Sequence, residues 1–430
     1  MFKTLSNAWK VPELRRKLLV TLLIVVLYRF GAVIPVPYVM ADAMREAIVA
    51  NTDGSIFQYL NILSGSAFSR ATLFALSISP YITASIVIQL LTVAIPALER
   101  LSKEGEEGRK KLTQITRYVT VILGLITAFG YYMYMRNIGA LTEDGRGVFG
   151  AFVIIACYSA GTALIMWLAE KINEFGIGNG ISMILLANIL SSGFSIVETL
   201  INYVKKGPWG LVTAEVIVGV SLAIITFVVF ITESERRLPV QYAKKVVGRK
   251  MYGGQNTNLP IKLNMSGVMP IIFANSIVAL PATLALIFPT TGHPIWGGIV
   301  NFFSSGSWAY VIIFVVLIVA FSYFYISISF NPVEVSNNLK KNGGFIPGIR
   351  PGKPTADYIK KVLGRITLIG AFFLCIVAAL PLIANIISGG TLGGIAFGGS
   401  SLLIVVGVIL ETARDLESQM TMRHYKGFLE

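Results

Sequence analysis

The chain has 430 residues, of which 54% are hydrophobic and 13% are charged, and its mean hydropathy is +0.71. These values exclude an ordinary soluble domain and are typical of a protein that crosses a membrane several times. The formal net charge of +14 would suggest nucleic-acid binding in a soluble protein, but in a membrane protein it first reports which side of the membrane each loop occupies.

Ten apolar runs approach the roughly 20 residues that a helix needs to cross a bilayer. They occupy residues 18–36, 73–95, 117–135, 149–169, 181–203, 211–232, 266–288, 308–330, 366–387 and 399–413. The first run follows a basic segment, as in a secretory signal, but no small-residue cleavage site follows it, so we expect it to remain as the first span. Cys157 and Cys375 lie inside apolar runs, which favours buried thiols over a disulfide scaffold. The sequence therefore predicts an all-α polytopic membrane protein with ten transmembrane helices.

The distribution of positive charge predicts the orientation of these spans. The two termini and the alternate loops on their side carry 29 of the 36 Lys and Arg residues, and the opposite side carries seven. The positive-inside rule therefore places both termini in the cytoplasm. Two groups of five spans enter the membrane in opposite senses, which is the topology of an inverted repeat with a pathway at its interface. We divide the chain into pseudo-symmetric halves on this topology alone, residues 1–203 and 204–430.

Residues 55–68 form an apolar piece too short to cross a bilayer core of roughly 30 Å. The next run, 73–95, is long enough, but Pro80 is expected to break its hydrogen-bond ladder and several Ser and Thr residues keep it partly polar. Half-length backbone is tolerated at membrane depth only where it is buried in protein or lines a cavity. We therefore expect residues 55–68 to be re-entrant and residues 73–95 to form a wall of a pathway. The alternative is an interfacial helix followed by an ordinary span.

Two loops on the cytoplasmic side are long and basic, residues 233–265 and 331–364. Both combine Pro and Gly turn signals with β-branched and aromatic residues, which predicts hairpin-like or short helical structure. Two basic fingers of this kind would make a docking surface. The alternative is a pair of solvated loops whose charge reflects only the positive-inside bias, although that reading accounts less well for Arg350, which lies between turn-forming residues.

The sequence offers little for catalysis or cofactor binding. His293 and His424 lie in an outer loop and in the C-terminal tail, so a histidine-based metal site or catalytic triad is not expected. The glycines of residues 176–180 follow a hydrophobic helix rather than a strand, which argues against a dinucleotide-binding loop. Gly343 and Gly348 have the spacing of a phosphate-binding loop but lack its Lys and Ser or Thr. We expect no enzyme activity, no metal and no cofactor.

The span centres carry neutral polar residues, Gln89, Asn188 and Asn275, while Arg29 lies near a span end within reach of water. No charged residue sits mid-span in the second, seventh or eighth predicted span. This argues against a small-solute secondary transporter, the main alternative function, because ion-coupled transport usually needs such a group. The neutral residues serve either as ordinary helix–helix hydrogen-bond partners or as weak contacts between helices that separate.

Five segments carry a more specific pattern. They are FALSISPYITASIVIQLL (Phe74–Leu91), MWLAEKINEFGIGNGISMIL (Met166–Leu185), QYAKKVVGRKMYGGQNTNLPIKLNMSGVMPIIFANS (Gln241–Ser276), NNLKKNGGFIPGIRPGKPT (Asn337–Thr355) and GGSSLLIVVGVILE (Gly398–Glu411). In order and spacing they resemble the bacterial SecY family, the channel subunits of the general protein-secretion translocon. One departure is Ser77, where the family usually has Gly; its added hydroxyl puts the tightness of the closed state in doubt.

The resemblance implies a clam-shaped channel whose halves hinge at the outer loop between spans 5 and 6. Unfolded secretory polypeptides would cross the membrane through it, and transmembrane segments would leave sideways into lipid. The implied pore ring is Ile78, Ile82, Ile181, Leu185, Ile272 and Ile404. The implied plug, at about residues 55–68, includes Ser55, Ile56, Phe57, Leu60, Leu63, Gly65 and Phe68. The lateral gate between spans 2–3 and 7–8 would include Ser85, Gln89 and Asn275.

The resemblance also implies partners and a location. The two basic loops would dock the SecA motor ATPase and the ribosome through Lys244, Arg249, Lys250, Lys340, Lys341 and Arg350. The small membrane subunits SecE and SecG, signal peptides, nascent secretory chains and membrane lipids are the other expected partners. The expected location is the cytoplasmic membrane of a bacterium.

Overall fold

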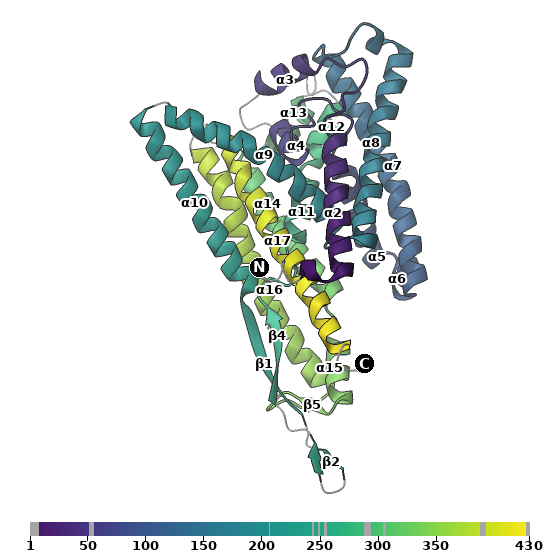
Figure 1. Cartoon of the computed structure of the whole chain (residues 1–430), viewed down its shortest axis with the longest axis vertical. Helices are drawn as coiled ribbons and strands as arrows, with labels where there is room; N and C mark the ends of the chain where they lie inside the picture. Colours follow the sequence, from purple (N-terminus) through teal and green to yellow (C-terminus); the bar gives the residue numbers. More distant parts are fainter. Residues whose placement is uncertain are drawn as a thin grey trace.

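The computed structural model describes residues 8–50, 56–205, 207–242, 245–247, 250–252, 256–287, 294–303, 307–387 and 393–426. Its helices run mostly side by side in one bundle, and a narrow β-hairpin projects from one end (Figure 1). Helix α2 begins, and helix α17 ends, toward the end of the bundle that carries the hairpin (Figure 1).

The first half of the chain consists of helices joined by turns. They are α2 (Pro12–Gly31), α3 (Ala41–Ala50), α4 (Ile56–Leu63), α5 (Ser79–Ala94), α6 (Pro96–Lys103), α7 (Glu106–Asn137), the 3-10 turn η1 (Asp144–Arg146), α8 (Val148–Phe175) and α9 (Gly180–Lys205). Helix α9 ends two residues beyond the predicted boundary between the halves at 203/204. Pro96 separates α5 from α6, which are bent by 101° at Ile95, because the residue before a proline disfavours the helical conformation.

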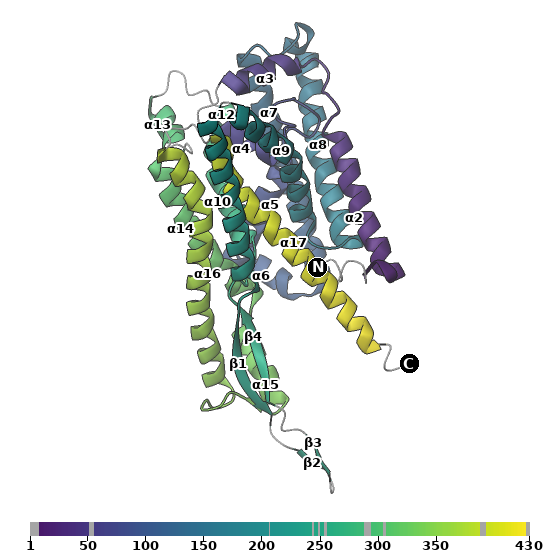
Figure 2. The same cartoon turned by 60° about the vertical axis from the view of Figure 1, so that its left-hand side comes forward.

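The second half contains α10 (Pro208–Glu233), α11 (Met269–Val278), α12 (Leu280–Ile287), α13 (Pro294–Phe302), α14 (Trp308–Ser329), α15 (Pro332–Lys341), α16 (Lys353–Ile387) and α17 (Gly393–Lys426). In Figure 2, α2 and α8 lie on one side of the molecule and α14 and α16 on the opposite side. The largest hydrophobic cluster joins residues of α2, α5, α9, α11, α14, α16 and α17. The core therefore belongs to both halves.

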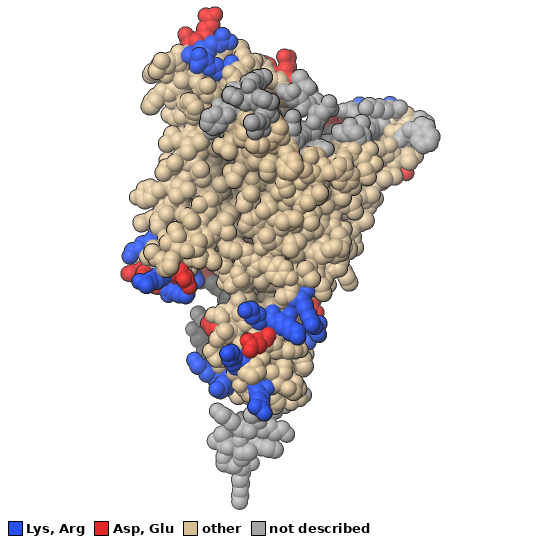
Figure 3. All heavy atoms as spheres, turned by 180° about the vertical axis from the view of Figure 1, so that it is seen from behind, with Lys and Arg blue, Asp and Glu red and all other residues tan. Residues whose placement is uncertain are grey.

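The predicted all-α polytopic fold is confirmed, and each of the ten predicted runs falls on a helix or a broken helix pair. Among the described residues, α7, α8, α10, α14 and α16 are individually long and apolar enough to span a membrane; α5 and α6 meet that test only when the bent pair is counted as one span. Helix α2 carries Arg15, Arg16 and Lys17 in its first two turns and Arg29 in its last turn, on either side of an apolar stretch. On the face shown in Figure 3, charged side chains gather toward the ends of the molecule and leave an uncharged belt between them.

The prediction that Pro80 interrupts a span over residues 73–95 is wrong. Residues 73–78 form turns, and α5 begins only at Ser79, so Pro80 lies in its first turn. A proline there removes no hydrogen bond, because the N–H groups of the first turn have no partner within the helix. The wall of the predicted pathway is therefore a short helix preceded by irregular backbone.

The two loops predicted to be cytoplasmic form one joint structure. Strand β1 (Glu235–Tyr242) pairs antiparallel with β4 (Asn256–Lys262), which confirms the hairpin predicted for residues 233–265. Strand β5 (Gly344–Phe345), from the second loop, pairs with the other edge of β1. The tip carries a second short hairpin, β2 (Lys245–Val247) and β3 (Lys250–Tyr252).

The second loop is shorter than predicted, because residues 353–364 already belong to α16. Leu238 and Val240 of β1 are buried with Ile346 and Ile359 in a small core of their own. This core fixes the hairpin against α16, so the two expected fingers make a single projection.

Candidate conducting pathway and its plug

The six predicted ring residues come from four helices. Ile78 is the N-cap residue of α5 and Ile82 lies in its first turn, Ile181 and Leu185 lie in α9, Ile272 in α11 and Ile404 in α17. Five of them are at most 3% exposed, and Ile181 is half-buried against the same cluster. The structure thus gathers side chains from both halves of the chain into one apolar contact.

A cavity of about 180 Å³ lies next to this contact. Ile82, Leu185, Ile272 and Ile404 of the ring line it, and so do three predicted plug residues, Leu60, Leu63 and Phe68. Ile78 and Ile181 do not line this cavity. Every residue that lines it is uncharged, so ring and plug meet at an apolar space with no ionisable group.

The predicted re-entrant piece is a helix of eight residues, α4, followed by turns up to residue 78. Ser55 lies outside the described residues, and Ile56 and Phe57 form the first turn of α4. Leu60 and Phe68 are buried and Leu63 is half-buried. Gly65 has φ +63°, and a Cβ atom built there would lie 2.6 Å from Nη1 of Arg29. The turn after α4 therefore requires glycine for its backbone and for its space.

The end of this segment is tied to α7 and α8. The Phe68 and Tyr131 ring centroids are 4.8 Å apart, and the Tyr131 hydroxyl donates a hydrogen bond of 2.6 Å to the Phe68 carbonyl. The Tyr158 hydroxyl donates to the Ala71 carbonyl at 3.1 Å. Aromatic hydroxyls thus bond two backbone carbonyls of the irregular segment, and the Phe68 carbonyl also accepts the Ala71 N–H at 3.3 Å.

Polar contacts also hold the plug segment at Leu63, the last residue of α4, and sequence reasoning missed them. Asn188 of α9 donates to the Leu63 carbonyl at 2.7 Å, and Ser77 donates to the same oxygen at 3.1 Å. Arg29, which we expected to reach toward water, instead donates to the Asn188 side-chain oxygen at 3.2 Å. The only indication in the sequence was that Asn188 is a polar residue in the middle of a predicted span, which suggests a polar partner.

The predicted lateral-gate residues lie on two helices that touch, α5 and α11. Asn275 of α11 is 5% exposed and lines the central cavity. The Gln89 amide donates to Ser85 one turn earlier in α5, at 3.3 Å, so this pair bonds within its own helix. Helix α12 also packs against α7. The seam between the halves therefore runs along α5 and α7 on one side and α11 and α12 on the other.

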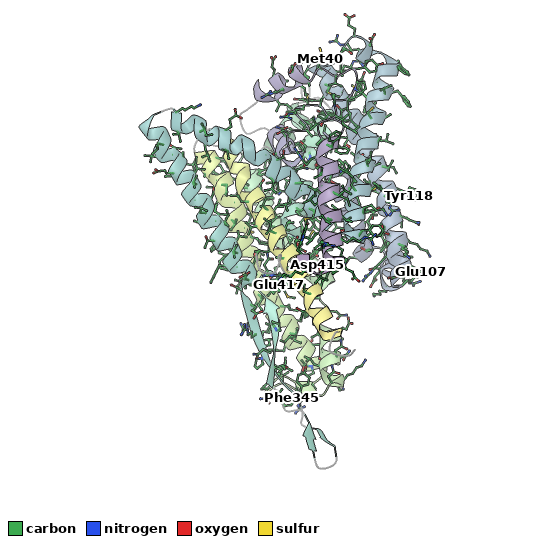
Figure 4. All side chains as sticks on the ribbon, viewed as in Figure 1. Met40, Glu107, Tyr118, Phe345, Asp415 and Glu417 are labelled. Carbon is green, nitrogen blue, oxygen red and sulfur yellow. The ribbon has the colours of Figure 1, made fainter. Side chains whose placement is uncertain are left out.

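A second, charged cavity of about 530 Å³ lies on the hairpin side of the ring, between α10, β4 and α17. Lys262, Glu411, Arg414 and Asp415 line it; Asp415 is labelled on α17 in Figure 4. Burial, together with the nearby charge of Arg414, lowers the pKa of Lys262. Glu411 follows Ile404 by seven residues in α17, which is about 10 Å along a helix. Charged walls thus begin a short distance below the apolar ring.

The predicted docking residues that the structure describes lie on the projection. Lys340 and Lys341 are exposed in the last turn of α15, and Arg350 is exposed in the loop before α16. That loop is held by hydrogen bonds from Thr355 to the Arg350 carbonyl, 2.8 Å, and from Ser336 to the Gly352 carbonyl, 2.7 Å. Phe345, labelled in Figure 4, marks the nearby end of the sheet. Lys250 belongs to β3, while Lys244 and Arg249 lie outside the described residues.

These features define a class: a helical membrane protein whose two halves meet at a buried apolar contact beside a short internal helix. A sequence model of the SecY family matches residues 72–413. The protein translocase subunit SecY of Thermus thermophilus is 43% identical over 437 aligned residues, covering 100% of this chain and 98% of that protein. The protein of the same name from Streptomyces galbus is 41% identical, and the alignment covers 100% of both chains. The chain belongs to the SecY family.

Solved structures agree with this fold. A structure described as that of a protein-conducting channel has a TM-score of 0.68 at 21% identity, covering 94% of this chain and 92% of that chain. Canine Sec61, solved in a ribosome-channel complex, has a TM-score of 0.65 at 19% identity, over 94% of this chain and 92% of that one.

Proposed function

We propose that this chain is the channel subunit of a bacterial protein-export machine. It passes unfolded secretory polypeptides across the cytoplasmic membrane and releases transmembrane segments sideways into lipid. The observation that carries the proposal is the convergence of apolar residues from α5, α9, α11 and α17 on one cavity that the plug segment also lines. Family membership supports the same function.

The six-residue ring acts as the seal of the closed channel. A narrow apolar constriction excludes water and therefore ions by dewetting. Dispersion contacts are non-directional, so the same ring fits around any side chain of a passing polypeptide. A ring of charged groups would instead bind some substrates and reject others. Helix α4 and the turns up to Phe68 close the pathway on the far side of the ring as the plug.

The seam between α5 and α7 on one side and α11 and α12 on the other acts as the lateral gate. Helices that must separate repeatedly need weak contacts, and interhelical hydrogen bonds between neutral groups in membranes average about 0.6 kcal/mol. Ser85, Gln89 and Asn275 are neutral polar residues along the seam; Gln89 bonds to Ser85 within α5, and Asn275 faces the central cavity. Opening there would let a segment of about 20 apolar residues partition into lipid.

The projection formed by β1–β5 and α15 is the docking surface for the SecA motor ATPase and for the ribosome. Arg350 can bind a carboxylate or phosphate with two parallel hydrogen bonds, which Lys cannot do. Lys340 and Lys341 add positive charge beside it, and Lys244, Arg249 and Lys250 belong to the same loops. Canine Sec61 was solved with a ribosome, which supports the ribosomal part of this proposal.

SecE and SecG are the proposed membrane subunits, and both termini of the chain lie in the cytoplasm. The chain itself has no catalytic role, and the energy comes from its partners. Within the described residues, no group of three or more His, Cys, Asp or Glu side chains could hold a metal ion. The described residues that line the central cavity include no ionisable side chain. A small-solute transporter usually needs one there to couple transport to an ion, so this lining disfavours that alternative.

Reconstitution tests the function. The purified chain with its membrane subunits is placed in lipid vesicles, and the motor ATPase, ATP and an unfolded secretory precursor are added outside. We expect the precursor to become protected from added protease in an ATP-dependent manner. Lack of protection, with vesicles shown to contain folded complex, would overturn the proposal.

A further inference from the structure

The carbonyl end of the plug helix is completed by side chains of the channel wall. A helix leaves its last four carbonyls without partners of its own. In α4, the Leu63 carbonyl accepts hydrogen bonds from Asn188, 2.7 Å, and from Ser77, 3.1 Å. The Ile62 carbonyl accepts one from the Ser192 hydroxyl at 3.4 Å. The turn after α4 itself bonds the Leu60, Asn61 and Ile62 carbonyls through the N–H groups of Ser64, Ser66 and Gly65. Since α4 packs against α9 (Figure 1), the wall supplies the donors for the remaining carbonyl, that of Leu63.

These donors form a connected and buried network. Asn188 is 0% exposed and Ser77 is 3% exposed, and the Asn188 amide also donates to the Ser77 hydroxyl at 3.2 Å. Arg29 of α2 orients that amide by donating to its oxygen at 3.2 Å, and it donates to Ser191 of α9 as well. The guanidinium therefore places a positive charge close to the carbonyl end of α4, where the helix dipole favours a cation.

Ser77 adopts a backbone conformation that favours glycine. Its φ is +53°, in the left-handed region where a side chain costs energy. The serine hydroxyl gains two polar neighbours, the Leu63 carbonyl and the Asn188 amide. A strained backbone thus carries a side chain that contacts the plug directly.

We propose that Arg29, Ser77 and Asn188 form a polar latch that holds the plug helix in the closed channel, and that the Ser77 hydroxyl makes this closed state tighter than glycine would. The proposal rests on the proposed role of residues 56–68 as the plug. Displacing α4 removes two donors from the Leu63 carbonyl at once and leaves Asn188 and Ser77 without that acceptor. Unpaired polar groups in a buried site are costly, so the latch sets a threshold for opening.

Single-channel recording in planar bilayers containing the purified complex tests the latch. Ser77→Ala removes the hydroxyl but keeps a side chain at the strained backbone position. We expect its open probability without substrate to rise about five-fold, the effect of losing one neutral hydrogen bond. Asn188→Ala removes the second donor at a position of ordinary helix backbone, and we expect a rise of at least the same size.

Ser66 provides the matched control. It also has a positive φ, +68°, and it lies in the same segment, but no hydrogen bond to its hydroxyl is found within the described residues. Ser66→Ala should leave the open probability unchanged. Equal open probabilities in Ser77→Ala, Asn188→Ala and the unmodified chain would overturn the latch.

Deletion of residues 56–68 distinguishes a failure of the latch from a failure of the plug assignment. If the deletion raises ion leak while the two latch variants behave as the unmodified chain does, the plug stands and the latch is wrong. If the deletion leaves the leak unchanged, the plug assignment itself is wrong and the latch falls with it. Increased opening in all three variants, with Ser66→Ala unchanged, supports both.

Discussion

The Tyr131 hydroxyl of α7 donates a hydrogen bond of 2.6 Å to the main-chain carbonyl of Phe68. Both side chains are at most 2% exposed, so the bond is shielded from water. It anchors the C-terminal end of the plug segment to α7, one of the helices that form the seam between the halves. The plug segment is therefore held at two points, by Tyr131 at Phe68 and by Asn188 and Ser77 at Leu63.

Removing this anchor should destabilise the closed protein. Tyr131→Phe keeps the ring contact with Phe68 but removes the stronger of the two hydrogen bonds to the Phe68 carbonyl, which retains only the Ala71 N–H; losing such a bond typically costs about 0.5–1.5 kcal/mol. We expect a lower midpoint of thermal unfolding for the purified complex. Tyr118→Phe, on the same helix (Figure 4) at 71% exposure, is the control and should leave the midpoint unchanged. Identical midpoints for the two variants would contradict the anchor.

Gly65 should not tolerate a side chain. At φ +63°, Gly65→Ala strains the backbone by about 1–2 kcal/mol and also places a Cβ atom against Arg29. We expect hydrogen exchange of the α4 amides to accelerate. Gly139→Ala isolates the backbone effect, since Gly139 has φ +74° and no neighbour within 4 Å of a built Cβ atom. Equal rates of α4 amide exchange in Gly65→Ala and Gly139→Ala would show that the close approach of Arg29 to position 65 does not destabilise α4.

A polar side chain in the ring should wet the closed channel. Ile82→Asn introduces a hydrogen-bonding group into an uncharged, largely apolar cavity, and wetting of an apolar constriction permits ion flow. We expect higher ion conductance in planar bilayers. Ile82→Leu conserves volume and hydrophobicity and should retain the seal. Unchanged conductance in Ile82→Asn would show that the seal lies elsewhere.

Reversing the charge of Arg350 should abolish motor-driven export while the protein stays folded. The side chain is exposed, so its reversal would remove the proposed docking contact without disturbing the core. Arg350→Lys should restore export only in part, because an ammonium cannot replace the two-pronged guanidinium. The assay is ATP-dependent protection of a precursor in vesicles. Arg146→Glu, an exposed arginine at the opposite end of the molecule, is the control; normal export by Arg350→Glu would remove the docking claim.

The helices were predictable because each span must bury its backbone polar groups in a long apolar run. Hydropathy located α7, α8, α10, α14 and α16 well. It placed the start of α5 too early, because residues 73–78 are apolar enough to resemble a span and nothing local reveals their turns. Strand β5 has two residues and forms only because β1 offers it an edge, so its pairing is a tertiary effect.

The candidate site was predictable only in part. The ring residues were located through the resemblance, because an Ile in a membrane helix carries no sign of which way it faces. The contact of Arg29 with Asn188 joins residues 159 positions apart in sequence, and no local pattern encodes it. The resemblance marks Ser77 as a departure from Gly. Whether its hydroxyl tightens or loosens the closed state depends on its φ and on its hydrogen bond to the Leu63 carbonyl, which only the structure gives.

Disulfide crosslinking of an arrested export substrate tests the conducting pathway most directly. In a background with Cys157→Ala and Cys375→Ala, single cysteines replace Ile82, Ile272 or, as a control, Leu222, which is 60% exposed on α10. The stalled polypeptide carries one cysteine at the depth of the membrane centre. We predict crosslinks to positions 82 and 272 and none to position 222. Crosslinks to position 222, with none to either ring position, would contradict a pathway through the ring.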